Sequence, residues 1–218
     1  MKTIKYQLKI KGLQSREGTI NVHALIELLQ QITSCAEHGL RFAIEGMSAK
    51  QGPTPSWLEK STDLIFTGLE TGSTVLDFEA PLLGDILSEN IAQQDLFIKQ
   101  PEPDDTAFSY ISRVIQDTTA EKLESDYYDA GVLTSLLMIK PFFQNRASEV
   151  ELYSPDRKNE KFSLNLSMME KIERLKVSLP EPRVSIISGY LNQIQHSRKQ
   201  FQLVIDEKQT IPGRIDEE

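Results

Sequence analysis

Apolar and polar residues alternate strictly at the start of the chain. Tyr6, Leu8 and Ile10 are separated by lysine and glutamine residues, and a period of two is typical of a half-buried β-strand. Asn21 then precedes a segment in which apolar residues recur every three or four positions through Ala36. Asparagine is a favoured helix N-cap, and this spacing gives a helix one apolar stripe. The beginning of the chain therefore predicts a strand followed by an amphipathic helix.

Two further apolar segments, 64–69 and 75–80, flank a turn that contains Gly72. Short apolar segments on either side of a glycine turn predict a β-hairpin. Pro53 lies in the loop before this hairpin, and we expect Trp57 to cover the core beneath that loop. The order strand, helix, strand, strand favours an antiparallel sheet with the helix packed across one face.

The spacing of apolar residues becomes helical again after residue 104. Asp105 or Thr106 is suited to cap one helix. A second helix carries Leu133 and Leu136. We expect this helix to end at Pro141, because proline disfavours a helical residue before it. The middle of the chain is therefore predicted to be mainly helical.

Short apolar segments at 150–153 and 162–164 predict a second, small hairpin, and a third helical stripe follows it. Alternation returns near the end of the chain in three segments, 184–194, 201–205 and 211–215. Three consecutive strands of this kind resemble the opening meander of a small β-barrel.

Two Pro-Glu-Pro motifs, at 101–103 and 180–182, divide the chain. Proline fixes φ and disfavours helix at the residue before it, so each motif predicts an extended joint. We therefore expect an α+β protein with three segments. They are an N-terminal antiparallel sheet with a packed helix (1–100), a mainly helical segment (101–180) and a short C-terminal β-meander (181–218).

Charge and cysteine content narrow the function classes. The 218 residues include 32 acidic and 24 basic side chains, a formal net charge of −8, which argues against a protein that coats nucleic acid. The acidic excess belongs to residues 1–150, whereas 151–218 is neutral overall. A single cysteine cannot form an internal disulfide, and no signal-peptide pattern or long apolar run is present. These features predict a cytoplasmic protein.

The sequence contains no motif for catalysis or cofactor binding. It has no glycine-rich phosphate loop and no Gly-x-Ser-x-Gly elbow. Cys35 falls on the apolar stripe of the first helix, where we expect a buried structural thiol. The three histidines lack the spacing of a metal site. We expect no catalytic, cofactor-binding or metal-binding residue, and a metal-dependent nuclease built on Asp156 and Asp206 stays open as a minor alternative.

Acidic residues concentrate between positions 104 and 129. One interpretation is that they cap helix N-termini and form a solvated surface. The other is that they dock a basic partner, such as the substrate groove of a nuclease. On the second interpretation, the expected partner-binding residues are Asp104, Asp105, Glu121, Glu124, Asp126, Asp129, Phe201 and Arg214.

The tail has a basic loop beside an aromatic residue. Arg198 and Lys199 precede Phe201, a combination that β-barrels use to bind single-stranded nucleic acid. The same combination occurs in ordinary hairpin loops. These three residues are the candidates for nucleic-acid contact.

Several motifs together resemble a family of uncharacterised bacterial proteins. They are the run LRFAIEG at 40–46, Gly52, Pro55, Trp57 and Leu58, the run GSTVLDFEAP at 72–81, and Asp104-Asp105-Thr106. The tail, with Gly189, Leu191 and Phe201 in alternating strands, is similar to the barrel-like C-terminal module of that family. Members of the family continue past the third tail strand. Either this chain has an unfinished barrel, or another chain completes the open edge of the sheet, and an unpaired edge favours such a partner.

The resemblance implies a gene that lies beside the gene of a PIN-domain ribonuclease. We therefore expect a non-enzymatic antitoxin-like or immunity-type protein that binds and neutralises a bacterial toxin, such as a PIN-type ribonuclease. The alternative is a nucleic-acid-binding accessory module that uses the C-terminal tail.

Overall fold

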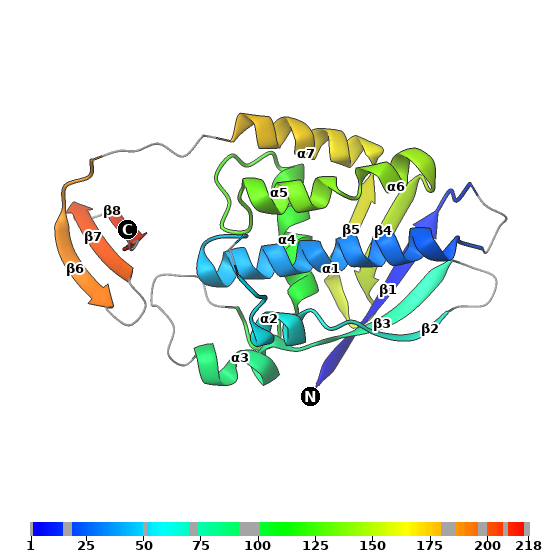
Figure 1. Cartoon of the computed structure of the whole chain (residues 1–218), viewed down its shortest axis with the longest axis horizontal. Coiled ribbons are helices and arrows are strands. Elements are labelled where there is room, and N and C mark those ends of the chain that lie inside the picture. The colour runs from blue at the N-terminus through cyan, green and yellow to red at the C-terminus, as the bar shows by residue number, and fades with distance from the viewer. Residues whose placement is uncertain are drawn as a thin grey trace. The chain divides into compact units, whose positions relative to one another are not determined.

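The computed structural model divides the chain into two compact units, Met1–Leu179 and Pro180–Glu218 (Figure 1). The residues it describes are 2–14, 19–49, 52–69, 74–91, 101–179, 186–195, 200–206 and 209–215. The protein is α+β, as the sequence predicts. Each unit contains its own antiparallel sheet.

A five-stranded sheet with the order β2-β3-β1-β4-β5 forms the centre of the N-terminal unit. Its strands are β1 (Thr3–Lys11), β2 (Ile65–Leu69), β3 (Val75–Pro81), β4 (Glu149–Ser154) and β5 (Arg157–Asn165). Both predicted hairpins are present, as β2–β3 and β4–β5. They are joined by β1, which pairs with β3 on one side and β4 on the other. The expected segments 1–100 and 101–180 therefore share one sheet.

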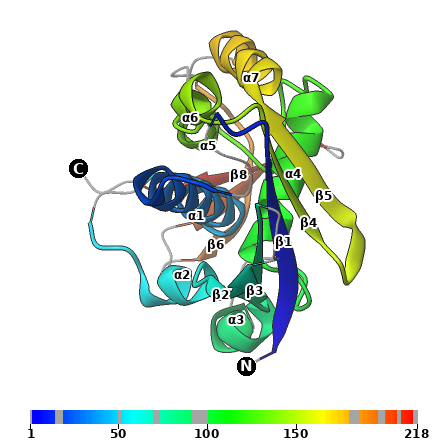
Figure 2. The ribbon, with the colours of Figure 1, turned by 90° about the vertical axis from the view of Figure 1, so that its right-hand side faces the viewer.

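Helices cover one face of this sheet, as Figure 2 shows. They are α1 (Val22–Glu45), α2 (Ser56–Ser61), α3 (Leu83–Ile91), α4 (Ala107–Thr119), α5 (Ala130–Leu137), α6 (Lys140–Asn145) and α7 (Leu166–Ser178). The predicted caps begin two of them. The Asn21 side chain accepts hydrogen bonds from the first turn of α1, and Thr106 forms a capping box with Ser109 at the start of α4.

The core lies between the sheet and these helices. Alternate residues of β1, including Tyr6 and Leu8, are buried, and the Tyr6 ring packs 5.7 Å from the Phe108 ring of α4. The helix α1 contacts α4 and α5, and α5 contacts α7. At Gly39, α1 packs against Tyr110 of α4 at a distance that would place an added Cβ in ordinary van der Waals contact.

The opposite face of the sheet is polar. Lys11 Nζ lies 3.3 Å from Glu149 Oε2 and 3.1 Å from Glu151 Oε2. Lys161 Nζ of β5 lies 2.5 Å from the other oxygen of Glu151. These cross-strand pairs offset the charge of Lys11 on the central strand β1.

The local pattern missed three short helices, α2, α3 and α6, whereas α5 ends before Pro141 as expected. The six-residue helix α2 forms where only a loop was expected, although Trp57 packs against the core as predicted. The helix α3 was also unexpected. Pro141 does not end the helical region; it stands in the first turn of α6, where its missing N–H has no intrahelical partner to lose.

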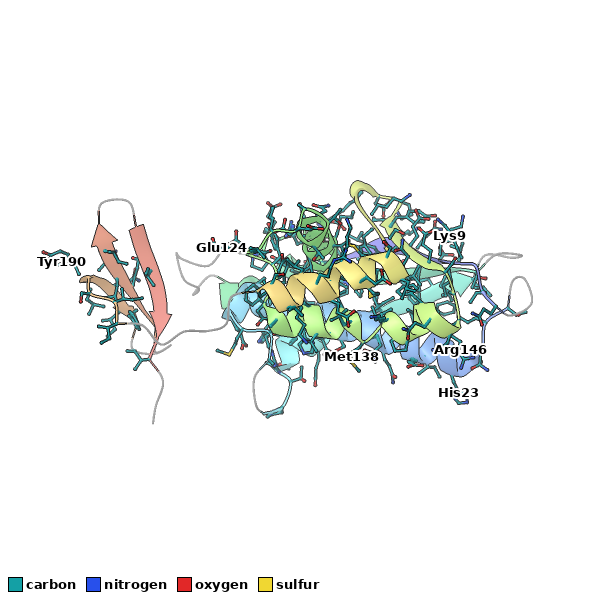
Figure 3. The ribbon with its side chains drawn as sticks, turned by 90° about the horizontal axis from the view of Figure 1, so that it is seen from above. Lys9, His23, Glu124, Met138, Arg146 and Tyr190 are labelled. Carbon is teal, nitrogen blue, oxygen red and sulfur yellow. The ribbon has the colours of Figure 1, made fainter. Side chains whose placement is uncertain are left out.

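The C-terminal unit is a meander with the order β6-β7-β8. Its strands are β6 (Tyr190–Gln195), β7 (Gln200–Asp206) and β8 (Gln209–Arg214). Leu191 pairs with Leu203, which pairs with Ile211, and Ile194 pairs with Phe201. One face of this three-stranded sheet is therefore apolar. Tyr190 extends from the other side of β6 (Figure 3).

No helix in the described part of the chain is both long enough and apolar enough to cross a bilayer.

Candidate partner-binding surface

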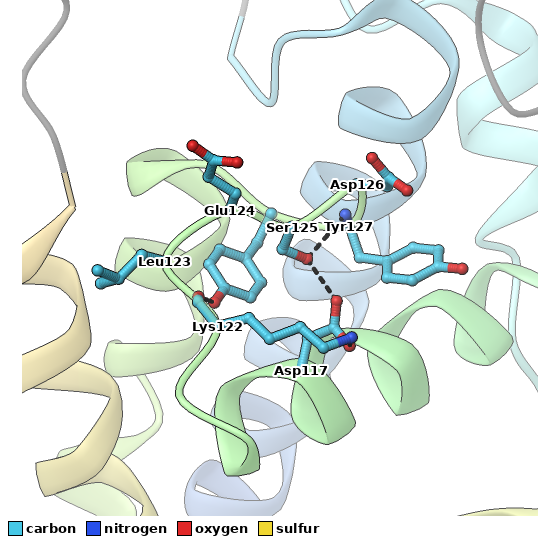
Figure 4. A pocket seen from close by; sticks show the side chains of 8 residues that line it. Asp117, Lys122, Leu123, Glu124, Ser125, Asp126 and Tyr127 are labelled. Carbon is cyan, nitrogen blue, oxygen red and sulfur yellow. Dashed lines mark hydrogen bonds and ion pairs between the residues drawn. The ribbon is translucent and has the colours of Figure 1, made fainter.

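The acidic residues between α4 and α5 divide into an inward and an outward group. The inward group begins with Asp117, which is buried at the end of α4. Its Oδ1 accepts a hydrogen bond from Lys122 Nζ at 2.6 Å, and its Oδ2 accepts one from Ser125 Oγ at 2.8 Å. The Ser125 hydroxyl in turn accepts the backbone N–H of Tyr127 (Figure 4). Asp117 therefore folds the loop onto the end of its own helix.

Asp129 holds the other end of the loop. Its Oδ1 accepts the backbone N–H of Val132 at 2.8 Å, which caps α5. Its Oδ2 accepts the backbone N–H and the hydroxyl of Ser48, at 3.1 and 2.8 Å. The Tyr128 hydroxyl also donates to the carbonyl of Lys122. These bonds tie the loop to the segment that follows α1, so Asp129 is a structural anchor.

The outward group is Glu121, Glu124 and Asp126, all exposed to solvent. Glu124 and Asp126 point away from the inner hydrogen bonds (Figure 4). Leu123 lies between the acids and is 51% exposed. We call these three acids and Leu123 the acidic loop surface.

Glu121 has a left-handed backbone conformation, with φ of +52°. This conformation costs a residue with a side chain roughly 1–2 kcal/mol. It persists because the inner hydrogen bonds determine the loop on both sides of it. The acidic loop surface is thus presented in one fixed geometry.

The neighbouring residues Asp104 and Asp105 have different environments. Asp104 is exposed, whereas Asp105 is only 4% exposed. Both oxygens of Asp105 accept hydrogen bonds from the Arg113 guanidinium, each at 2.8 Å. Arg113 also lies over the Tyr110 ring, 5.0 Å from its centroid. The Asp105 carboxylate is engaged inside the unit, and Asp104 is the member of the pair that faces solvent.

A second buried polar group links α4 to the β4–β5 hairpin. Glu160 accepts hydrogen bonds from Ser109 Oγ and from Arg157 Nη1, at 2.9 and 2.8 Å, and from the Tyr6 hydroxyl. Burial, followed by the charge of Glu160, raises the pKa of Tyr6. No sequence pattern indicated this group, because its members are distant in the chain and no local spacing connects them.

The tail residues are only partly described. The Phe201 ring packs against Gly213, where an added Cβ would lie 2.2 Å from the ring. Phe201 is therefore half-buried against its own sheet. Arg198 and Lys199 lie outside the described residues, as do the side chains of Arg214 and Asp206.

The groups considered for catalysis form no cluster among the described residues. Cys35 is buried, and burial raises the pKa of its thiol to about 12, which disfavours a thiolate nucleophile. His38 bonds to the carbonyl of Ser34 at 2.8 Å, and His23 lies at the other end of α1. Asp156 is exposed in the turn between β4 and β5. In the described ranges, no three His, Cys, Asp or Glu residues are grouped so as to hold a metal ion.

Comparison of the chain with protein families, curated proteins and solved structures found no match.

Proposed function

We propose that this chain is a non-enzymatic, antitoxin-like or immunity-type protein that binds and neutralises a basic bacterial toxin such as a PIN-type ribonuclease. The acidic loop surface would cover the cationic groove in which the toxin holds RNA. The observation that carries the proposal is that the acids of this loop have two different roles: some hold the loop in place, and the others face solvent. Asp117 and Asp129 hold the loop, which leaves the outward carboxylates available to a partner.

The fixed conformation of the loop favours binding to a partner. A loop that is ordered before binding loses less conformational entropy when the partner arrives. Exposed ion pairs are each worth only about 0.2–1 kcal/mol. We therefore expect the carboxylates to accelerate and orient the encounter, and Leu123 to add apolar contact beside them.

The C-terminal meander offers the same partner a second contact. Its strand β6 has the sequence YLNQIQ, which contains no charged residue. Leu191 and Ile194 of β6 are 56% and 55% exposed. At the other edge, β8 contains Pro212, which has no N–H to donate. An extended segment of the toxin would therefore add to β6 in preference to β8.

The test uses the purified chain and the PIN-type ribonuclease that the family resemblance implies beside its gene. Stoichiometric addition of the chain should abolish RNA cleavage, and the inhibition should weaken as salt is raised. The triple variant Glu121→Lys, Glu124→Lys, Asp126→Lys should slow association at low salt by about tenfold or more.

A matched control carries Glu27→Lys, Glu59→Lys and Asp63→Lys, three exposed acids outside the loop. This control should inhibit like the unchanged chain. Full RNA cleavage in the presence of excess unchanged chain would refute the proposal. A band shift of single-stranded RNA by the isolated chain would instead support the nucleic-acid-binding alternative.

A further inference from the structure

A depression lies beside the C-terminal half of β5, where α4 and α7 flank the strand (Figure 2). Its lining residues come from all three elements: Ile115, Gln116 and Thr119 from α4, Lys161, Phe162, Ser163 and Asn165 from β5, and Ser167, Met168 and Lys171 from α7. Most of the exposed side chains among them are polar.

The depression lies at the free edge of the sheet. Ser163 and Phe162 point to opposite faces of β5, because Ser163 pairs with Glu151 on the polar face and Phe162 pairs with the core residue Leu152. A depression that touches residues of both faces must reach around an edge of the strand. The other edge of β5 is paired with β4. The depression therefore borders backbone groups that have no strand partner among the described strands.

The lining contains two lysines and no acidic residue. Lys161 is balanced by Glu151, at 2.5 Å. Lys171 is half-buried, and no ion pair or hydrogen bond of its side chain is found in the described part of the chain. The same lining contains Gln116, Asn165 and Ser167, whose side chains carry amide or hydroxyl groups. The depression can therefore accept negative charge and hydrogen-bonding groups.

We propose that this edge binds an extended acidic peptide, which adds to β5 as a sixth strand. The peptide backbone would pair with β5, and a carboxylate of the peptide would contact Lys171. The stretch 161–165 would pair with about five peptide residues, roughly 17 Å of strand. This site is separate from the acidic loop surface, and the proposal goes beyond the proposed function.

The charges of β5 decide between an acidic peptide and a second copy of the chain. The strand reads RKNEKFSLN and carries more basic than acidic residues. A second copy would offer Lys171 the same edge, whose lining contains two lysines and no carboxylate, so it supplies no counter-ion. A peptide of opposite charge gains attraction that a second copy lacks.

The test measures binding of the full chain to an array of acetylated six-residue peptides in which glutamate alternates with Val, Ile, Thr, Phe or Tyr. At least one peptide should bind with a dissociation constant below about 1 mM. Lys171→Glu should weaken this binding by about fivefold or more, as expected for one lost charge pair and one new repulsion. Lys60→Glu, which alters an exposed lysine of α2, should leave it unchanged.

Two further measurements separate strand addition from simple anion binding. The same peptide methylated on alternate backbone nitrogens keeps its charge but loses donors, and should not bind. Hydrogen exchange of the β5 amides should slow when the unmodified peptide binds. Absence of binding across the array, equal binding of the methylated peptide, or displacement by inorganic phosphate alone would each overturn the proposal. Lys171→Glu protein that unfolds like the unchanged chain in urea excludes misfolding as the cause of lost binding.

Discussion

The two sheets of this protein have similar apolar patterns but different surroundings. In the N-terminal unit, one face of the sheet is covered by helices and supplies much of the core. In the C-terminal unit, the apolar residues of β6 remain more than half exposed. Among the described residues of that unit, Gln202 is buried, and its side chain accepts a hydrogen bond from Asn192. Alternation builds both sheets, but a covering layer turns only one of them into a core.

Because of this difference, we expect the two units to have different roles, one in stability and the other in binding. A three-stranded sheet without a second layer is near the limit of independent stability. The N-terminal unit buries enough apolar surface to fold without the tail. We therefore expect the N-terminal unit to act as the scaffold that holds the acidic loop surface, and the meander to present its apolar face to a partner.

The strongest test of the comparison is the same substitution made in both sheets. Leu8→Ala removes a fully buried side chain from the central strand β1, and should lower the free energy of unfolding by about 3 kcal/mol. Leu191→Ala, in the exposed strand β6, should change it by less than about 0.5 kcal/mol. Urea unfolding followed by the fluorescence of Trp57, the single tryptophan, measures the first effect, and circular dichroism follows both. Similar losses for the two variants would mean that the meander is covered as well as the N-terminal sheet.

The sequence predicted those parts of the fold that depend on neighbouring residues. The strands came from alternation, and the helix starts came from Asn21 and Thr106, whose side chains bond within one turn. The position of β4 beside β1 was not predictable in this way. Leu8 pairs with Leu152, and a residue pattern of period two fits any strand order equally well. The six residues of α2 are too few to show a helical period.

The sequence was also unable to predict which acids of the candidate surface face solvent. Asp104 and Asp105 are adjacent and chemically identical, yet one faces solvent and the other is buried. The difference arises from Arg113, about two turns further along the chain. Its guanidinium forms an ion pair with the Asp105 carboxylate. Burial of a carboxylate depends on where its counter-ion lies in three dimensions, so the sequence could place acids near a surface but could not sort them.

Ion pairs form on the polar face of the N-terminal sheet, and none is found among the described residues of the meander. The contribution of these pairs to stability should depend on pH. A hydrogen bond from Lys161, supported by Lys11, lowers the pKa of Glu151. Because the unfolded chain takes up its proton at a higher pH than the folded one, this pair stabilises the fold above the ordinary glutamate pKa and loses that contribution as pH falls. Glu151→Gln should reduce stability at pH 7 by less than about 1 kcal/mol. It should also make the loss of stability between pH 5 and 3 shallower.

Urea unfolding at half-unit steps of pH measures this slope. Glu59→Gln, at an exposed acid of α2, serves as the control and should keep the slope of the unchanged protein. An identical slope in Glu151→Gln would show that the pairs on the polar face do not contribute to stability.

Removal of residues 180–218 should produce the smallest change in the N-terminal unit. The described core consists of residues between Tyr6 and Leu175, so a chain that ends at Leu179 retains all of it. Its unfolding free energy, measured through Trp57, should lie within about 0.5 kcal/mol of the full chain. The isolated segment Pro180–Glu218 should show no cooperative unfolding, because fewer than about 40 residues rarely bury enough surface without a disulfide, a metal or a partner. A loss above about 2 kcal/mol in the shortened chain would contradict the comparison, since it would require the meander to stabilise the N-terminal unit.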